Sequence, residues 1–160
     1  MKIELCERTR KHVQVYFERV QDPEIQNLLP QTVTSLQQAL ANFEKTQQPD
    51  ATSYGRTVYL DGVYVGDVWC YGIDLSDTPQ TMVSYCIFDK SQWGKGIMSR
   101  ALAMFISEIT CRYGISTIGA FSFSDNKASA RVLEKNGFRI METFIEDGRE
   151  SVYLQIGGKQ

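Results

Sequence analysis

The centre of this 160-residue chain carries a strand, a glycine turn, a helix and a second strand in succession. The runs "TMVSYCIF" (81–88) and "ISTIGAFSF" (115–123) are apolar and of strand length, and Gly94-Lys95-Gly96 follows the first of them. The segment from about 97 to 113 has the apolar spacing of a helix, with Leu102, Phe105, Ile106 and Ile109 on one face. A strand–helix–strand connection within one sheet is almost always a right-handed crossover between parallel strands. The pattern therefore predicts a parallel pair of strands within an α/β sheet.

The remaining strands are predicted to be mostly antiparallel. Asp61-Gly62 and Asp147-Gly148 are strong signals for two-residue hairpin turns. The first turn is flanked by "YGRTVYL" and "VYVGDVWCYGI", and the second by "FRIMETFIE" and "ESVYLQI". Near the N-terminus, "KIELCER" alternates apolar and polar residues, which predicts a first strand.

Helices are predicted at three further places. The first carries Val13, Tyr16, Phe17 and Val20 and ends near Asp22-Pro23. The second follows Pro30, and its apolar stripe is Val33, Leu36, Leu40 and Phe43. The third is "NKASARVLEKN" (126–136), which Gly137 ends. We therefore expect an α/β fold in a single domain over residues 1–160, with a mixed, mostly antiparallel sheet.

Charge and hydropathy exclude several classes of partner. The chain has 17 Lys and Arg against 19 Asp and Glu, a net charge of −2, so it lacks the clustered positive charge of a nucleic-acid-binding protein. The N-terminus carries acidic residues and no apolar core of a signal peptide. No apolar run approaches the roughly 18 residues that cross a membrane. We expect a cytoplasmic protein with neither nucleic acid nor membrane as partner.

The cysteines do not form a metal motif. Cys6, Cys70, Cys86 and Cys111 include no C-x-x-C pair, and His12 is the only histidine. We expect four reduced thiols and no metal site.

The glycine turn has two interpretations. It can be only a tight connection, or it can bind an anion, because the first N–H groups of a helix lack partners and carry the positive end of the helix dipole. The Rossmann pattern fails, since Ser99 stands where a third glycine is required, and the Walker A spacing is absent. The tripeptide alone leaves the choice open.

A second segment favours the anion. "NKASARVLEKNGF" (126–138), taken with "QWGKGIMSRAL" (92–102), resembles the GNAT superfamily of acetyl-CoA-dependent N-acetyltransferases. The second of these segments is similar to the family's pyrophosphate loop, and the first to its Asn-x-x-Ser helix ending in Glu-Lys-x-Gly-Phe. The two leading helices and Trp-Gly-Lys-Gly are most similar to the branch with the ribosomal-protein alanine and spermidine acetyltransferases.

The resemblance implies a GNAT-like fold, with helices on both faces of the sheet and a V-shaped splay between the two parallel strands. It implies acetyl-CoA as cosubstrate, a primary amine as acceptor and direct attack in a ternary complex without an acyl-enzyme. The residues expected to bind the cosubstrate are Ile87, Phe88, Trp93, Gly94, Lys95, Gly96, Ile97, Met98, Ser99, Asn126 and Ser129. Asn126 is equally well explained as a helix N-cap, and Lys95 as a solvated surface lysine.

Two positions depart from the family pattern in the turn. Trp93 stands where Gln or Arg is usual, and Met98 stands where Gly or Ala is usual. The Met98 side chain must therefore point away from the pyrophosphate.

The catalytic groups are less clearly marked. The resemblance places the oxyanion donor at the strand-end N–H near Phe88. Leu133 stands where many members have an acidic tyrosine, so Ser129 is the candidate proton donor, with Tyr85 as a weaker one. No general base stands out among the acids considered, which are Glu4, Glu24, Asp67, Glu108 and Glu146.

Three functions remain open from the sequence. The first is acetyl transfer to a protein N-terminus, a polyamine or another small amine. The second is a catalytically degenerate acyl-CoA-binding sensor or regulatory module, and the third is a purely structural domain. Acids in the leading helices and the last hairpin would suit a cationic acceptor, and that hairpin is a candidate homodimer contact; these acids are Asp22, Glu24, Glu146, Asp147 and Glu150.

Overall fold

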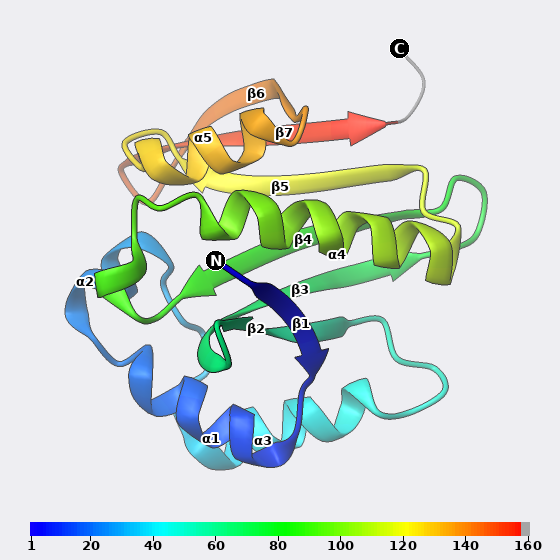
Figure 1. The fold of residues 1–160 in the computed structure, drawn as a ribbon. Helices are drawn as coiled ribbons and strands as arrows, with labels where there is room; N and C mark the ends of the chain where they lie inside the picture. Colours follow the sequence, from blue (N-terminus) through cyan, green and yellow to red (C-terminus); the bar gives the residue numbers. More distant parts are fainter. Residues whose placement is uncertain (158–160) are drawn as a thin grey trace.

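The computed structural model describes residues 1–157 as a seven-stranded sheet with helices on both faces (Figure 1). The strands lie in the order β1-β2-β3-β4-β5-β7-β6. Their bounds are β1 (Ile3–Glu7), β2 (Tyr54–Leu60), β3 (Val63–Asp74), β4 (Gln80–Ile87), β5 (Thr117–Phe123), β6 (Arg139–Glu146) and β7 (Arg149–Gly157). The helices are α1 (Arg10–Arg19), α2 (Pro23–Leu28), α3 (Leu36–Thr46), α4 (Ile97–Tyr113) and α5 (Lys127–Lys135), with a short 3₁₀ turn, η1 (Lys90–Gln92).

Among the strands of residues 1–157, only β4 and β5 are parallel neighbours, as the crossover pattern predicts. They pair at just three positions, Gln80↔Thr117, Thr81↔Ile118 and Met82↔Gly119. Beyond Met82 both strands continue without pairing to each other, and they diverge toward α2 in Figure 1. The predicted V-shaped splay is therefore confirmed, and it opens the sheet on the side where α4 and α5 begin.

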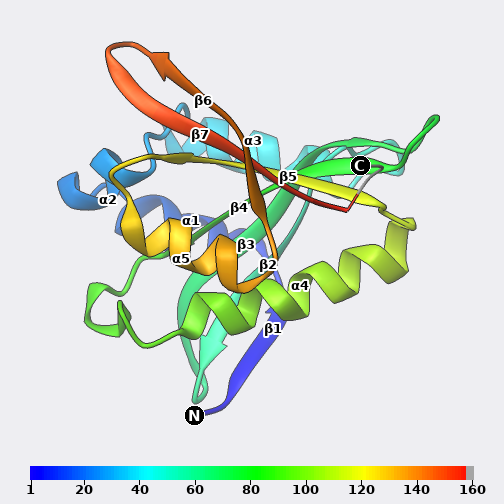
Figure 2. The ribbon, with the colours of Figure 1, turned by 90° about the horizontal axis from the view of Figure 1, so that it is seen from above.

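The helices form two layers. Seen from above in Figure 2, α4 and α5 lie on one side of the sheet and α1, α2 and α3 on the other. Helix α4 supplies the centre of the core, where Ala101, Leu102, Phe105 and Ile109 are fully buried against the strands. The expected placement of helices on both faces of the sheet is thus confirmed.

The N-terminal helices differ from the sequence prediction in number and in start. Asp22-Pro23 begins a helix, α2, instead of only ending one: the Asp22 carboxylate accepts from the Glu24 and Ile25 N–H groups, and proline occupies the first helical turn, where it needs no N–H partner. The next helix starts at Leu36, because the Ser35 hydroxyl caps it by accepting from the Gln38 N–H. Val33 therefore lies outside the helix, and its assignment to the apolar stripe was wrong.

Candidate functional site

The splay leaves backbone groups of β4 without a strand partner. The Phe88 N–H donates to the Val65 carbonyl at 3.0 Å, so Phe88 and Val65 form a hydrogen-bonded pair of the β3–β4 ladder. Opposite residues of an antiparallel ladder alternate between bonded and non-bonded pairs. Val83, Tyr85 and Ile87 consequently direct their backbone groups away from β3 and toward the gap left by β5.

This register corrects the sequence-based choice of oxyanion donor. The Phe88 N–H is engaged with β3, and its ring packs in the cluster with Tyr16 and Ile25 on the α1 side of the sheet. Phe88 therefore does not present a free donor to the splay. The N–H groups that face the gap belong to its neighbours Tyr85 and Ile87.

Trp93 fixes the open end of β4. Its indole Nε1–H donates to the Ile87 carbonyl oxygen at 2.7 Å. That carbonyl is therefore occupied, and Ile87 offers only its N–H to a ligand in the splay. The tryptophan that departs from the family pattern thus has a structural role, which is to hold the glycine turn against the strand end.

The glycine turn places the start of α4 at the mouth of the splay. Gly94 and Gly96 have left-handed φ angles of 78° and 76°, and a Cβ built on either would meet nothing within 4 Å. Gly96 is the N-cap of α4 and has no side chain to satisfy the first-turn N–H groups. The side chains of Ile97 and Met98 are buried in the core, so their N–H groups are left facing the turn, as the Met98 departure required.

A cavity of about 350 Å³ joins these parts. Its walls come from β4, the glycine turn, the start of α4, β5 and α5, and they include Ile87, all of Trp93 to Ser99, Asn126 and Ser129. Except for Phe88, the structure therefore brings every residue expected to bind the cosubstrate to one cavity. The volume falls within the range of about 300–1,000 Å³ for small-molecule sites.

Asn126 and Ser129 begin helix α5 at the edge of this cavity. The Asn126 side-chain oxygen accepts from the Ser129 N–H at 3.1 Å, so Asn126 is the N-cap of the helix. Its amide nitrogen is not used in that bond. The capping interpretation is therefore confirmed, while contact with a ligand through the remaining amide stays a prediction.

Ser129 is paired with a tyrosine from β4. The two hydroxyl oxygens, Tyr85 Oη and Ser129 Oγ, lie 2.9 Å apart in the wall of the cavity. Burial raises the pKa of the Tyr85 hydroxyl to about 12, and the hydrogen bond with Ser129 partly opposes that rise. The Tyr85 hydroxyl is thus fully protonated at neutral pH and can donate. Sequence reasoning considered both residues but gave no reason to join them, because 44 residues separate them.

A second, larger cavity of about 980 Å³ lies on the opposite face of the sheet, between α1, α3 and strands β2 to β4. Ser84 and Leu29 line both cavities. Ser84, on the splayed strand, therefore borders both cavities. The sequence prediction missed this cavity, since its lining is scattered from Arg8 to Ser84 without a motif.

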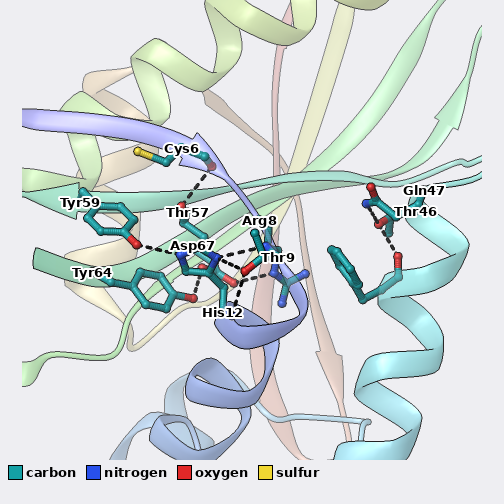
Figure 3. Close-up of polar contacts among 11 residues, drawn as sticks. Cys6, Arg8, Thr9, His12, Thr46, Gln47, Thr57, Tyr59, Tyr64 and Asp67 are labelled. Atoms are coloured by element: carbon teal, nitrogen blue, oxygen red, sulfur yellow. Dashed lines mark hydrogen bonds and ion pairs between the residues drawn. The ribbon is translucent and has the colours of Figure 1, made fainter.

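A buried acid is paired with Arg8, which lines the larger cavity (Figure 3). Asp67 is 1% exposed and is the only buried acid within residues 1–157. It accepts a hydrogen bond from the Tyr64 hydroxyl at 2.5 Å, and the Arg8 Nε lies 3.0 Å from its other oxygen in an ion pair without good hydrogen-bond alignment. Burial raises the Asp67 pKa to about 6, against the opposing charge of Arg8 and the Tyr64 bond.

His12 closes the same polar cluster (Figure 3). Its Nε2 lies 2.7 Å from the Tyr59 hydroxyl, and its Nδ1 lies 2.8 Å from the Thr9 hydroxyl. Burial and the nearby Arg8 charge lower its pKa. His12 is therefore a packing residue at the start of α1, and it lines neither cavity.

The acids expected to attract a cationic acceptor lie elsewhere. Lys90 Nζ lies 2.8 Å from Asp22 and 3.4 Å from Glu24, so a lysine neutralises that pair. None of Asp22, Glu24, Glu146, Asp147 and Glu150 lines either cavity. These acids therefore lie outside both cavities, and their suitability for a cationic acceptor stays a prediction. Glu108 is likewise occupied, by Tyr54 and by Arg56 at 2.9 Å.

Over residues 1–157 no group of three or more His, Cys, Asp or Glu is arranged to hold a metal ion. All four cysteines are unpaired, and burial raises the pKa of Cys86 to about 12. Among the helices described here, none is long and apolar enough to span a membrane.

Comparison with known families agrees with this architecture. The family model described as "Acetyltransferase (GNAT) domain" matches residues 2–139. The chain therefore belongs to the GNAT acetyltransferase family, as the two sequence motifs predict. No curated protein sequence matches it significantly.

Solved structures show the same fold at low sequence identity. Spermidine N-acetyltransferase from Vibrio cholerae, in complex with CoA and spermine, superposes with a TM-score of 0.85 at 13% identity, covering 97% of this chain and 95% of that one. RimJ of Mycobacterium smegmatis, in complex with CoA-disulfide, gives 0.83 at 18% identity, with coverages of 97% and 81%. Ribosomal-protein-S5-alanine acetyltransferase from Vibrio fischeri gives 0.80 at 19%, with coverages of 97% and 91%.

Proposed function

We propose that this protein transfers the acetyl group of acetyl-CoA to a primary amine, by direct attack within a ternary complex. The observation that carries the proposal is the splay between β4 and β5 with an uncapped helix N-terminus at its mouth, both lining one cavity. The family match and the CoA-bound solved structures support the same cosubstrate. In this proposal the whole chain, 1–160, is one acetyltransferase domain.

The pyrophosphate of the cosubstrate is assigned to the N–H groups from Gly94 to Ser99. Phosphate at a helix N-terminus is stabilised both by unpaired N–H donors and by the helix dipole. The pantetheine arm then runs into the splay, where the N–H groups of Tyr85 and Ile87 face it. Those N–H groups are also the assigned donors to the oxyanion that develops on the thioester carbonyl.

The reaction forms one C–N bond and breaks one C–S bond. A neutral amine attacks the thioester carbonyl with its lone pair, CoA departs as a thiolate, and the amine loses one proton while the thiolate gains one. We assign the donor to the Tyr85–Ser129 pair, because its two hydroxyls are hydrogen-bonded and line the cosubstrate cavity. The Ser129 hydroxyl delivers the proton and Tyr85 passes its own proton to Ser129. The proton released by the acetylated amine returns to Tyr85 through water, so both hydroxyls end the cycle protonated.

The location and assembly of the protein are part of the proposal. We expect a cytoplasmic enzyme, since acetyl-CoA and reduced thiols fit that compartment. The exposed β6–β7 hairpin, with Ile140, Met141 and Ile145 more than half exposed, is the candidate homodimer contact.

Measurement of CoA release tests the function. Purified protein with acetyl-CoA and a panel of primary amines should give equal amounts of free CoA and acetylated amine, separated by chromatography and identified by mass. Saturable acetyl-CoA binding without turnover of any amine would instead favour the sensor function. Gly96→Glu is the matched negative control, because it fills the proposed pyrophosphate position.

A further inference from the structure

We propose that the larger cavity binds a small primary amine whose body is uncharged and aromatic, and that it discriminates against polycationic amines. This inference rests on the proposed function, since it names the class of acceptor for that reaction. It arises from the composition of the cavity wall and from its connection to the cosubstrate cavity.

Aromatic rings form one part of the wall of this cavity, beside polar side chains. The rings come from both of its sides: Tyr16 and Phe17 on α1, Phe43 on α3, and Trp69 and Tyr71 on β3. Rings on opposite walls can take an aromatic guest in edge-to-face or offset-stacked contact. A flexible guest without a ring cannot make such ring-to-ring contacts.

The charges of the wall do not favour a polycation. Within residues 1–157, the charged residues that line the cavity are Arg8, Lys45 and Asp50, two positive and one negative. Arg8 is paired with the buried Asp67, so the remaining Lys45 and Asp50 approximately cancel. A second ammonium group on the acceptor would therefore enter a cavity with no surplus carboxylate. An unpaired ammonium group of this kind disfavours binding of a polycation relative to a monoamine.

The amino group of the acceptor must lie near the cosubstrate cavity. Ser84 is the polar residue common to the two cavities, and it lies on the splayed strand next to Tyr85. An amine placed at Ser84 approaches the smaller cavity, while the body of the acceptor occupies the aromatic wall. The volume of about 980 Å³ accommodates a body of drug-like size.

A substrate competition tests the inference directly. The kcat/KM for phenylethylamine and tyramine is compared with that for spermidine and kanamycin, with acetyl-CoA saturating and the acetylated products measured by mass. We expect the aromatic amines to be preferred by about tenfold or more. Equal or better turnover of either polycation would overturn the inference while leaving acetyl transfer to amines intact.

A binding measurement separates failure of the inference from failure of the proposed function. Phenylethylamine and spermidine are titrated calorimetrically into protein saturated with CoA, which requires no chemistry. Tighter binding of phenylethylamine is expected even if no amine is acetylated, and that outcome would contradict only the proposed reaction. Tighter binding of spermidine, or no binding of phenylethylamine, overturns the inference.

Variants locate the effect in the cavity. Phe17→Ala should raise the KM for phenylethylamine about tenfold while changing kcat less, since it removes a wall and no reacting group. Lys45→Glu should lower the KM for spermidine about fivefold, the size of one exposed ion pair. Lys11→Glu makes the same charge change on exposed α1 surface that lines neither cavity, and it should change neither KM. If Lys45→Glu behaves like Lys11→Glu and Phe17→Ala leaves KM unchanged, the acceptor lies elsewhere.

Discussion

Asp67 should make the stability of this protein fall as the pH rises, and Asp67→Asn isolates that effect. The carboxyl is fully buried, and burial outweighs the favourable charge of Arg8, so its pKa rises from 3.8 to about 6. Below pH 3.8 the group is protonated in both the folded and the unfolded chain. Between pH 3.8 and 6 the folded chain holds the proton more tightly than the unfolded chain. The contribution of Asp67 to folding is therefore present at low pH and is lost as the pH passes 6.

The size of the loss follows from the pKa shift. A rise of about 2.2 units corresponds to about 3 kcal/mol, at about 1.4 kcal/mol per unit. Asparagine has nearly the shape of the protonated acid and no charge to bury. The free energy of unfolding of the wild-type protein, minus that of Asp67→Asn, should thus decrease by about 3 kcal/mol between pH 3.5 and pH 7.

Urea unfolding at a series of pH values measures this difference. Asp22→Asn is the matched control with the opposite sign: the hydrogen bond and charge of Lys90 lower the Asp22 pKa, so its contribution is present at neutral pH and lost as the pH falls. Asparagine at this position keeps the N-cap of α2. A wild-type advantage over Asp67→Asn that grows with pH would refute the reasoning, because the Arg8 charge would then outweigh burial.

Further changes test the site and the sheet. Ser129→Ala and Tyr85→Phe should each lower kcat by a factor of up to about 100 in steady-state assays, with unchanged acetyl-CoA affinity. If the two hydroxyls act as a unit, the kcat of the double variant should be no lower than that of the single variants. Gly119→Ala should destabilise the protein by about 1–3 kcal/mol in urea unfolding, because its Cβ would lie 2.6 Å from the Tyr153 hydroxyl, and Tyr153→Phe should recover part of the loss. Trp93→Phe removes the 2.7 Å bond to the β4 carbonyl and should weaken acetyl-CoA binding about fivefold in calorimetry; unchanged affinity would contradict its assigned role.

The sequence predicts this fold well where local chemistry decides the structure. The hairpins at Asp61-Gly62 and Asp147-Gly148 form as expected, because both aspartates take the positive φ angles that such turns require. The helix ending at Gly137 also follows a local rule, and the Phe138 N–H closes it by donating to the Leu133 carbonyl. By contrast, Asp22-Pro23 can end one helix or begin another, and only the structure decides between them.

The candidate site likewise has parts that local sequence chemistry predicts and parts that it does not. Sequence motifs predict the residues of the glycine turn and of α5. They can do so because an anion site is formed by a few N–H groups that follow one another along the chain. The pairing of Tyr85 with Ser129, and the engagement of the Phe88 N–H with Val65, depend on sheet register, which no pattern within one strand specifies. The aromatic cavity is still less visible in the sequence, because its walls come from helices and strands far apart along the chain.

Calorimetric titration of acetyl-CoA tests the central claim, which is that the glycine turn and the splayed strands bind the cosubstrate. The wild-type protein should bind with one site, and acetyl-CoA at about 100 times its dissociation constant should add about 2.7 kcal/mol to stability. Gly96→Glu places a negative side chain at the proposed pyrophosphate position and should abolish binding. Gly62→Glu is the matched control, because Gly62 has a similar left-handed φ of 82° in open space on a distant hairpin, and it should bind like wild type. The account would be contradicted if the wild-type protein did not bind acetyl-CoA. It would also be contradicted if Gly96→Glu bound acetyl-CoA as well as Gly62→Glu does.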